Sequence, residues 1–197
     1  MLVPLTTYVR DAIFPPDAAT AAPSNAGPPP PTHLVDAYCG AGLFALTLAP
    51  HFAKVAGIEL SADSIRFATH NAELNGLTHV SFRAGDAAQI FSAVGDFPPA
   101  RTAVVIDPPR KGCDEAFVRQ LLAFRAQTVV YVSCNVHTQA RDVGQIVSWS
   151  EEEDAAEIVA EGKRKGKYIL ESLRGFDLFP QTAHVESVAV LRLISSS

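Results

Sequence analysis

The cysteine at position 134 stands in a setting that favours chemistry. A β-branched stretch, typical of a buried strand, runs directly into Ser133-Cys134-Asn135. Open α/β sheets place their functional groups at the carboxyl ends of strands. A single cysteine is ordinarily a small, inert, buried hydrophobe, and that interpretation suffices for Cys39 and Cys113. The polar neighbours of Cys134 and its place at a strand end weigh against an inert role, so we consider it a candidate nucleophile.

A glycine-rich turn follows the first predicted strand. It carries Gly40, Gly42 and Leu43, and Ala45 completes a Gly-x-Gly-x-x-Ala pattern. Glycines at a strand-to-helix turn let the backbone turn sharply and approach a ligand closely. Glu59 ends the second predicted strand, where a carboxylate can accept both hydroxyls of a ribose. The pattern suits a dinucleotide as well as another nucleoside cofactor, so by itself it does not decide between them.

Two further carboxyl groups end predicted strands. Asp86 ends the third, where its side chain could reach an adenine amino group. Asp107 ends the fourth and is followed by Pro108-Pro109 and Arg110. A rigid double proline can form a wall beside a planar base while the aspartate supplies hydrogen bonds, whereas a dehydrogenase does not need such a wall. The alternative role for Asp107 is that of a helix cap or turn residue.

Strands and helices alternate from residue 32 onward. We expect strands at 33–38, 54–58, 80–84, 103–106 and 128–133, and helices at 4–14, 43–52, 61–75, 114–124 and 137–149. Two strands without an intervening helix, 168–177 and 184–194, close the chain. Such alternation predicts an α/β fold with a doubly wound, mostly parallel, seven-stranded sheet. The last two strands would form an antiparallel hairpin at its edge.

Length and composition indicate one globular domain. The chain has 197 residues, of which 48% are hydrophobic, enough to bury a core. No apolar run reaches the roughly 18 residues that span a bilayer, and the N-terminus lacks the features of a secretory signal. We therefore expect an intracellular protein, cytoplasmic or nuclear. Residues 1–31 are interpreted as an N-terminal helix and a Pro-rich linker, and residues 32–197 as the catalytic domain.

Charge and ligand-type residues restrict the partners. A net charge of −5 argues mildly against nucleic-acid binding. A basic cluster at 163–167 follows the acidic run 151–154, and we interpret the two together as a solvated loop of mixed charge. Three free cysteines and six scattered histidines lack the spacing of a zinc site, so no metal is expected.

Four motifs occur together and in a fixed order. They are Asp36-x-Tyr38-Cys39-Gly40-x-Gly42, Asp107-Pro108-Pro109-Arg110-Lys111-Gly112, Ser133-Cys134-Asn135 and Phe179-Pro180-Gln181-Thr182-x-His184-Val185-Glu186. Jointly they resemble the RNA 5-methyluridine methyltransferase family, most closely its fungal tRNA (uracil-5)-methyltransferases. The resemblance extends over nearly everything from residue 5 onward, apart from the Pro-rich segment. It implies the Rossmann-like fold of methyltransferases that depend on S-adenosylmethionine.

The resemblance also implies roles for single residues. Cys134 is the thiolate that adds to carbon 6 of a uridine in RNA and so makes carbon 5 enolate-like. The expected substrate is the T-loop uridine of tRNA. Glu186 is the base that removes the proton from carbon 5, and burial can raise its pKa towards the working pH. Asp107 orients the uracil ring, with Arg110 nearby. The residues implied to hold S-adenosylmethionine are Tyr38, Gly40, Gly42, Leu43, Glu59, Asp86 and Asp107.

Departures from the family pattern leave alternatives open. Val136 stands where bacterial members commonly have a proline. A family glutamine that helps to bind cofactor and base, and the family's RNA-binding portion, precede the segment that matches residues 2–13. A truncated, non-catalytic remnant that binds only the cofactor is therefore a second hypothesis. An NAD-dependent oxidoreductase, motivated only by Gly40-x-Gly42-x-x-Ala45 and Glu59, is a third. The sequence makes no prediction of oligomeric state.

Overall fold

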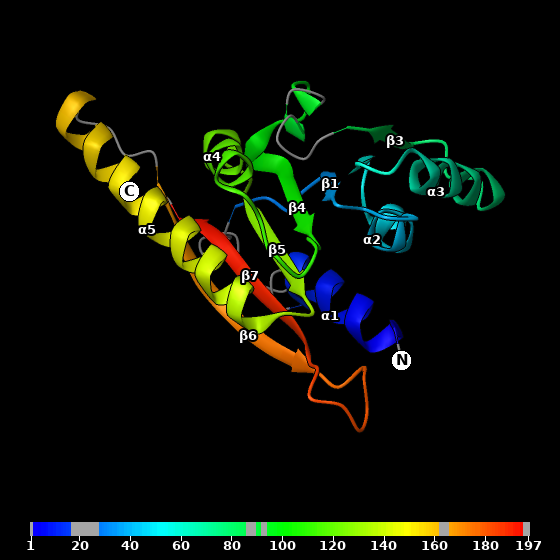
Figure 1. The fold of residues 1–197 in the computed structure, drawn as a ribbon. Coiled ribbons are helices and arrows are strands. Elements are labelled where there is room, and N and C mark those ends of the chain that lie inside the picture. The colour runs from blue at the N-terminus through cyan, green and yellow to red at the C-terminus, as the bar shows by residue number, and fades with distance from the viewer. Residues whose placement is uncertain (1, 17–27, 86–89, 92–93, 162–165, 195–197) are drawn as a thin grey trace.

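A single sheet of seven strands organises the fold (Figure 1). The computed structural model describes residues 2–16, 28–85, 90–91, 94–161 and 166–194. The strand order is β3-β2-β1-β4-β5-β7-β6. The bounds are β1 His33–Ala37, β2 Lys54–Glu59, β3 Val80–Ala84, β4 Thr102–Ile106, β5 Thr128–Ser133, β6 Lys167–Phe176 and β7 Glu186–Ile194. Strands β1 to β5 pair in parallel, and β7 is antiparallel to both of its neighbours. The predicted α/β fold class is confirmed.

Helices cover both faces of the sheet. Their bounds are α1 Leu2–Ile13, α2 Leu43–Leu48, α3 Ala62–Leu74, α4 Glu115–Phe124 and α5 Val136–Glu161. The short 3-10 helices are η3 Ala49–His51 and η5 Pro99–Arg101. Helices α1 and α2 contribute to one buried cluster with alternate residues of the central strands. Helices α4 and α5 contribute to the other cluster, on the opposite face. The central strands β4 and β5 are buried throughout, which explains their continuous β-branched runs.

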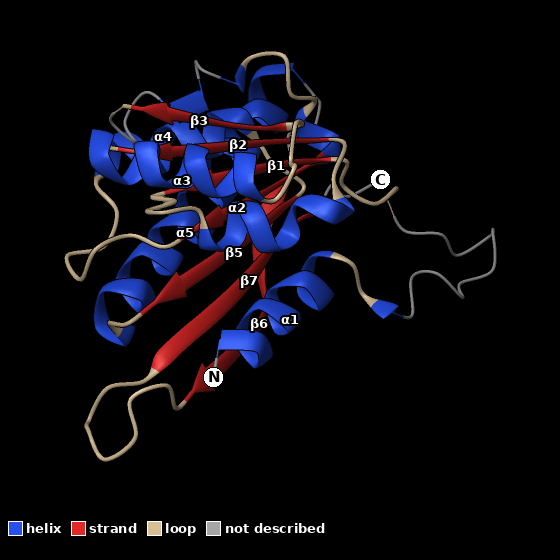
Figure 2. Cartoon of the chain, turned by 90° about the vertical axis from the view of Figure 1, so that its right-hand side faces the viewer, coloured by secondary structure: helices blue, strands red, loops and turns tan. Residues whose placement is uncertain are grey.

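The predicted hairpin is present, and it lies at the predicted edge. Strand β7 pairs with both β5 and β6, and β6 comes last in the strand order, so β6 forms the outer edge of the sheet among the described strands. The connection between them, residues 177–185, projects beyond the rest of the sheet in both views (Figures 1 and 2). Insertion of β7 beside β5 places Ser187 opposite Ser133, next to the proposed nucleophile.

Two helix boundaries differ from the prediction for local reasons. Helix α2 stops at Leu48 and continues as a 3-10 turn, because Pro50 has no backbone N–H to donate to the preceding turn. Helix α5 extends to Glu161 instead of ending at 149. Residues 150–161 are largely glutamate and alanine, which favour helix, and contain no glycine or proline.

The interpretation of residues 151–154 as part of a mixed-charge loop is therefore wrong. These residues belong to α5. The buried Asp154 accepts a hydrogen bond from the backbone N–H of Gly166 at 2.7 Å, and Glu151 forms an ion pair with Lys167. Residues 163–165 of the basic cluster lie outside the described part of the chain.

Helix α1 packs into the same core as the sheet. Its buried residues Leu5, Val9 and Ile13 join the cluster that contains α2 and the central strands. The predicted helix at 4–14 is therefore present, and it is packed rather than detached. The division into units at residues 1–31 and 32–197 stays a prediction. None of the described helices is long and apolar enough to cross a membrane.

Candidate active site

The turn between β1 and α2 has the backbone geometry that its glycines predict. Gly40 and Gly42 have φ values of 52° and 94°, and Tyr38 between β1 and the glycines has a φ of 61°. A Cβ atom at Gly42 would lie 3.1 Å from the side chains of Leu46 and Phe82, in a backbone conformation that is strained for any other residue. At Gly40 a Cβ atom would meet nothing within 4 Å, so this part of the turn faces open space.

The buried carboxyl group of Asp36 holds this turn in place. The Oδ2 atom of Asp36 accepts a hydrogen bond from the backbone N–H of Ala45 at 2.7 Å, which ties β1 to the first turn of α2. Burial raises the pKa of Asp36 to about 8, and the nearby charges of Asp107 and Glu59 act in the same direction. Among the described residues, nothing forms a hydrogen bond with the other oxygen, Oδ1, although it is buried.

Glu59 connects the end of β2 to the glycine turn. Its two carboxylate oxygens accept hydrogen bonds from the backbone N–H groups of Gly40, at 3.3 Å, and Ser61, at 3.0 Å. Beside it lies a cavity of about 330 Å³, lined by Tyr38, Ile58, Glu59, Leu60, Gly85, Asp107, Pro109, Lys111, Gly112 and Asp114. The cavity brings together three of the predicted cofactor residues from three different strand ends. Gly40, Gly42 and Leu43 belong to the adjacent turn, and Asp86 lies outside the described residues.

Two carboxyl groups with raised pKa values lie at this edge of the sheet. Asp107 follows β4, and burial raises its pKa to about 6. Glu186 begins β7 and is buried. Burial raises the pKa of Glu186 to about 7, with a smaller contribution from the negative charge of Asp107. Both groups therefore titrate near neutral pH, where a carboxyl group can take up and release a proton.

Cys134 lies at the same edge and is partly exposed. The preceding Ser133 fixes the turn, because its hydroxyl accepts a hydrogen bond from the Asn135 N–H at 3.0 Å. The side chains of Asn135 and Thr138 both donate to the carbonyl oxygen of Arg110, at 2.9 and 3.1 Å. The loop that carries the cysteine is thus bound directly to the loop that carries Arg110.

One residue near the site gave no signal in the sequence analysis. The buried Asp142 of α5 accepts hydrogen bonds from the Cys113 backbone N–H and the Tyr131 hydroxyl, each at 2.7 Å. Asp142 falls within the helix predicted at 137–149, and no recognisable motif surrounds it in the sequence. The spacing of Thr138, Arg141 and Asp142, which places three polar side chains on one face of that helix, is the pattern that could have indicated it.

The remaining titratable candidates do not extend the site. Cys39 and Cys113 are buried, and burial raises the pKa of both thiols, as expected for inert cysteines. Within the described part of the chain, no group of three or more His, Cys, Asp or Glu side chains could hold a metal ion.

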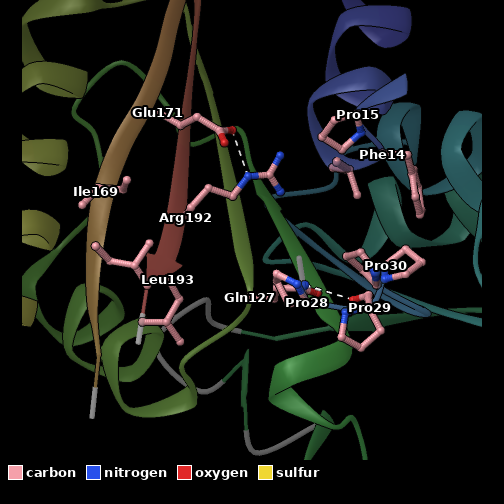
Figure 3. A pocket seen from close by; sticks show the side chains of 13 residues that line it. Phe14, Pro15, Pro28, Pro29, Pro30, Gln127, Ile169, Glu171, Arg192 and Leu193 are labelled. Atoms are coloured by element: carbon pink, nitrogen blue, oxygen red, sulfur yellow. Dashed lines mark hydrogen bonds and ion pairs between the residues drawn. The ribbon is translucent and has the colours of Figure 1, made fainter. Parts of the chain in front are cut away.

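A larger, apolar cavity lies elsewhere (Figure 3). It has a volume of about 720 Å³ and is bordered by the prolines 28–31, the end of α1 and the outer strands β6 and β7. Its polar features are the ion pair between Arg192 and Glu171, at 2.8 Å, and Gln127, which donates to the Pro29 carbonyl oxygen at 3.0 Å. None of the predicted site residues lines it. We therefore place the candidate active site at the smaller, more polar cavity.

Comparison with known proteins agrees with the motifs. A family model described as tRNA (Uracil-5-)-methyltransferase matches residues 30–193. The tRNA (uracil(54)-C(5))-methyltransferase of Schizosaccharomyces pombe is 43% identical over 197 residues, which is 100% of this chain and 33% of the relative. The enzyme of the same name from Saccharomyces cerevisiae is 43% identical over 96% of this chain and 27% of its own length. The chain thus spans about a third or less of these relatives.

Solved structures show the same fold. The Pyrococcus abyssi tRNA (uracil-54, C5)-methyltransferase, solved in complex with S-adenosyl-L-homocysteine, has a TM-score of 0.69 and 26% identity, over 96% of this chain and 37% of that chain. TrmN from Thermus thermophilus, at 20% identity and a TM-score of 0.57, covers 83% of this chain and 45% of that chain, and shows the fold alone.

Proposed function

This chain belongs to the tRNA (uracil-5-)-methyltransferase family, and on that premise we propose that it transfers a methyl group from S-adenosylmethionine to carbon 5 of a uridine in tRNA. The names of two relatives specify uracil 54 of tRNA, and we propose that the target here is this T-loop uridine. The observation that carries the proposal is the meeting of three groups at one edge of the sheet. The partly exposed Cys134 follows the end of β5, Glu186 begins the paired strand β7, and Asp107, after β4, lines a cavity of about 330 Å³.

The cavity suits a nucleoside cofactor. Its volume lies at the lower end of the range of about 300–1,000 Å³ that is typical of small-molecule sites. The Glu59 carboxylate can accept ribose hydroxyls, and the open turn at Gly40 allows close approach. The residues proposed to hold the cofactor are Tyr38, Gly40, Gly42, Leu43, Glu59, Asp86 and Asp107. When bound, S-adenosylmethionine supplies an electrophilic methyl group on a positively charged sulfur.

The proposed chemistry begins at Cys134. Carbon 5 of uracil is a poor nucleophile. Addition of the Cys134 thiolate, through Sγ, to carbon 6 moves the electron pair of the double bond between carbons 5 and 6 towards carbon 5 and the carbonyl group at carbon 4. Asp107 orients the uracil ring through hydrogen bonds. The backbone of Pro108-Pro109 is rigid and forms a fixed wall beside the ring. We assign Arg110 the role of stabilising the negative charge that develops on the ring. This step raises the reactivity of carbon 5 without any redox change.

Glu186 completes the reaction. After carbon 5 has been methylated it still carries its proton, which the Glu186 carboxylate accepts. The electron pair of that C–H bond re-forms the double bond between carbons 5 and 6, and the bond from carbon 6 to Sγ breaks. A pKa of about 7 suits this role, because a base works best when its pKa lies near the working pH.

A trapping experiment tests the nucleophile. Transfer RNA containing 5-fluorouridine has no proton to lose at carbon 5, so the adduct with the wild-type chain should persist through a denaturing gel. Cys134→Ala should form no adduct while still binding S-adenosylmethionine. An adduct that survives this substitution would refute Cys134 as the nucleophile. Cofactor binding without any adduct in the wild type would instead support the non-catalytic remnant.

Calorimetry tests the cofactor independently. We expect the wild-type chain to bind S-adenosylmethionine and S-adenosylhomocysteine but not NAD. Glu59→Gln should weaken binding about tenfold or more, because a charged acceptor for the ribose is lost. Binding of NAD without binding of S-adenosylmethionine would overturn the proposed function in favour of an oxidoreductase.

A further inference from the structure

The loop after Pro108-Pro109 is attached to the first turns of α5 through its own backbone. Asn135 and Thr138 hold the carbonyl oxygen of Arg110. The next residues along the helix continue the contact, since Arg141 donates to the carbonyl oxygens of Lys111, at 2.9 Å, and Cys113, at 3.4 Å. Backbone atoms of residues 110, 111 and 113 are thus held by side chains of α5 and of Asn135, which directly precedes it. We call residues 110–113 the clamped loop.

Asp142 is the central acceptor of this network. Its Oδ2 atom accepts both the Cys113 backbone N–H and the Tyr131 hydroxyl at 2.7 Å. Its Oδ1 atom accepts two hydrogen bonds from the Arg141 guanidinium, at 2.8 and 2.6 Å. Hydrogen bonds to a buried charged group are stronger than neutral ones, and an unpaired partner left behind is costly. The carboxylate therefore joins the clamped loop, α5 and strand β5.

The fit between the loop and Asp142 leaves no space for a side chain. Gly112 has a φ of 79°, and a Cβ atom there would lie 2.4 Å from Asp142 Oδ2 and 2.6 Å from a guanidinium nitrogen of Arg141. Because Gly112 lies so close to Asp142, the neighbouring Cys113 N–H can form its 2.7 Å hydrogen bond with the Asp142 carboxylate. The close approach also places Lys111 and Gly112 in the wall of the candidate cofactor cavity.

Tyr131 links this wall to the nucleophile. It lies in β5, three residues before Cys134, and its side chain is fully buried. A central strand is among the most rigid parts of an α/β fold. The Tyr131 hydroxyl, on that strand, holds Asp142. Through Asp142 it sets where the clamped loop lies relative to Cys134. Small errors in such spacing are costly to catalysis.

We infer that Tyr131 and Asp142 are positioning residues, which hold the clamped loop as the wall of the cofactor cavity at a fixed distance from Cys134. The inference rests on the proposed function, because it assigns S-adenosylmethionine to that cavity. Neither residue needs to touch the cofactor or the uridine. Their effect passes through the backbone of 110–113.

The chain offers a matched control for the test. Tyr168 on β6 is also fully buried, and its hydroxyl donates a hydrogen bond of the same length, 2.7 Å, to the carbonyl oxygen of Ala126. Neither Tyr168 nor Ala126 belongs to the clamped loop or lines the cavity. Tyr131→Phe and Tyr168→Phe each remove one buried hydroxyl and preserve the ring. Because its acceptor is charged, Tyr131→Phe should cost more stability than Tyr168→Phe, so both are compared well below their unfolding temperatures, where only Tyr131→Phe should affect the site.

The readout is the affinity for S-adenosylhomocysteine, measured by calorimetry well below the unfolding temperature of each variant. Tyr131→Phe should raise the Kd about tenfold, because the loop that lines the cavity is no longer held in one position. Tyr168→Phe should leave the Kd within about twofold of the wild type. Asp142→Asn, which keeps one oxygen acceptor for the Cys113 N–H, should raise the Kd less than Asp142→Ala.

The possible results separate this inference from the proposed function. If the wild type binds S-adenosylhomocysteine and Tyr131→Phe binds it equally well, the positioning role is overturned. Equal weakening by Tyr131→Phe and Tyr168→Phe would also overturn it, because the effect would then not depend on the contact with Asp142. If the wild type itself does not bind S-adenosylhomocysteine, it is the proposed function that fails. Should Asp142→Ala not fold, Tyr131→Phe and Asp142→Asn still decide the question.

Discussion

At the scale of single residues, the distinctive feature is a pair of carboxyl groups that titrate near neutral pH. Asp107 and Glu186 both have raised pKa values because they are buried, and the charge of Asp107 adds to the effect on Glu186. Two carboxylates in one site oppose each other's ionisation. Their separate roles in the proposal, orientation for Asp107 and proton removal for Glu186, therefore depend on a shared electrostatic environment.

Asp107→Asn should lower the pKa of Glu186. Removal of the like charge favours the ionised form of Glu186, but its pKa should stay above the ordinary value because burial is the larger cause. Carbon-13 NMR of labelled glutamate, titrated from pH 4 to 9, would follow this carboxyl group. The control is Asp114→Asn, which changes a cavity residue whose charge does not contribute to the raised pKa of Glu186. A Glu186 pKa that rises or does not change would contradict the coupling.

Glu186→Gln should stop the reaction after methylation. Without a base the carbon 5 proton stays in place, so an adduct between Cys134 and ordinary uridine accumulates. Turnover should fall about 10²- to 10⁴-fold, the usual contribution of a positioned base. Denaturing gels with labelled tRNA would show a slow band in Glu186→Gln and none in Cys134→Ala. Turnover at the wild-type rate would remove Glu186 from the mechanism.

At the scale of elements, the site depends on how closely the loop after β4 packs against α5. Gly112→Ala should destabilise the protein by about 2 kcal/mol or more, because the new methyl group meets the Asp142 carboxylate in a backbone conformation that disfavours alanine. Gly144→Ala, within α5 and with nothing within 4 Å of the added Cβ atom, should stabilise it by about 0.5–1 kcal/mol.

Urea unfolding of both glycine variants measures these effects. The two substitutions add the same methyl group within or beside the same helix, so opposite signs would show that the position of Gly112, through its contact with Asp142 and its positive φ, excludes a side chain. A neutral Gly112→Ala would mean that the loop can move away from α5 at little cost. The close packing would then not be a constraint on the site.

At the scale of the whole molecule, buried carboxyl groups connect stability to pH. The pKa of Asp36 is raised to about 8, so between pH 4 and 8 the folded chain keeps a proton that the unfolded chain has released. A state that binds more protons loses stability as pH rises. The contribution of Asp36 therefore makes the free energy of unfolding fall across this window.

Asp36→Asn should flatten this dependence. An asparagine can still accept the hydrogen bond from the Ala45 N–H through its side-chain oxygen. Because asparagine does not titrate, this position then binds no proton in either the folded or the unfolded chain. Relative to the wild type, the variant should gain stability steadily from pH 5 to pH 8.5, on the order of a few kcal/mol in total. Urea unfolding at several pH values measures this difference. A constant offset between the two proteins would show that Asp36 does not titrate in this range.

The sequence by itself determined most of the framework. β-Branched runs, glycine turns and helix caps are local signals, and they placed each of the seven strands within a few residues. The same signals located Cys134, Asp107 and Glu59 at strand ends, because parallel strands bring their carboxyl ends to one edge. Local patterns were weakest at the end of α5, where an acidic run suggested a loop although its residues favour helix.

The tertiary structure alone decided which distant groups interact. The charge of Asp107 raises the pKa of Glu186 because β7 inserts beside β5 and brings the two carboxyl groups close. No short stretch of sequence specifies that insertion. Asp142 is likewise an ordinary helical residue until packing buries it against the loop at 110–113 and the hydroxyl of Tyr131. Burial and charge act through space. The pKa values of the site, and the hydrogen bonds that hold the clamped loop, therefore follow from how strands and helices pack. They do not follow from the order of residues along any one of them.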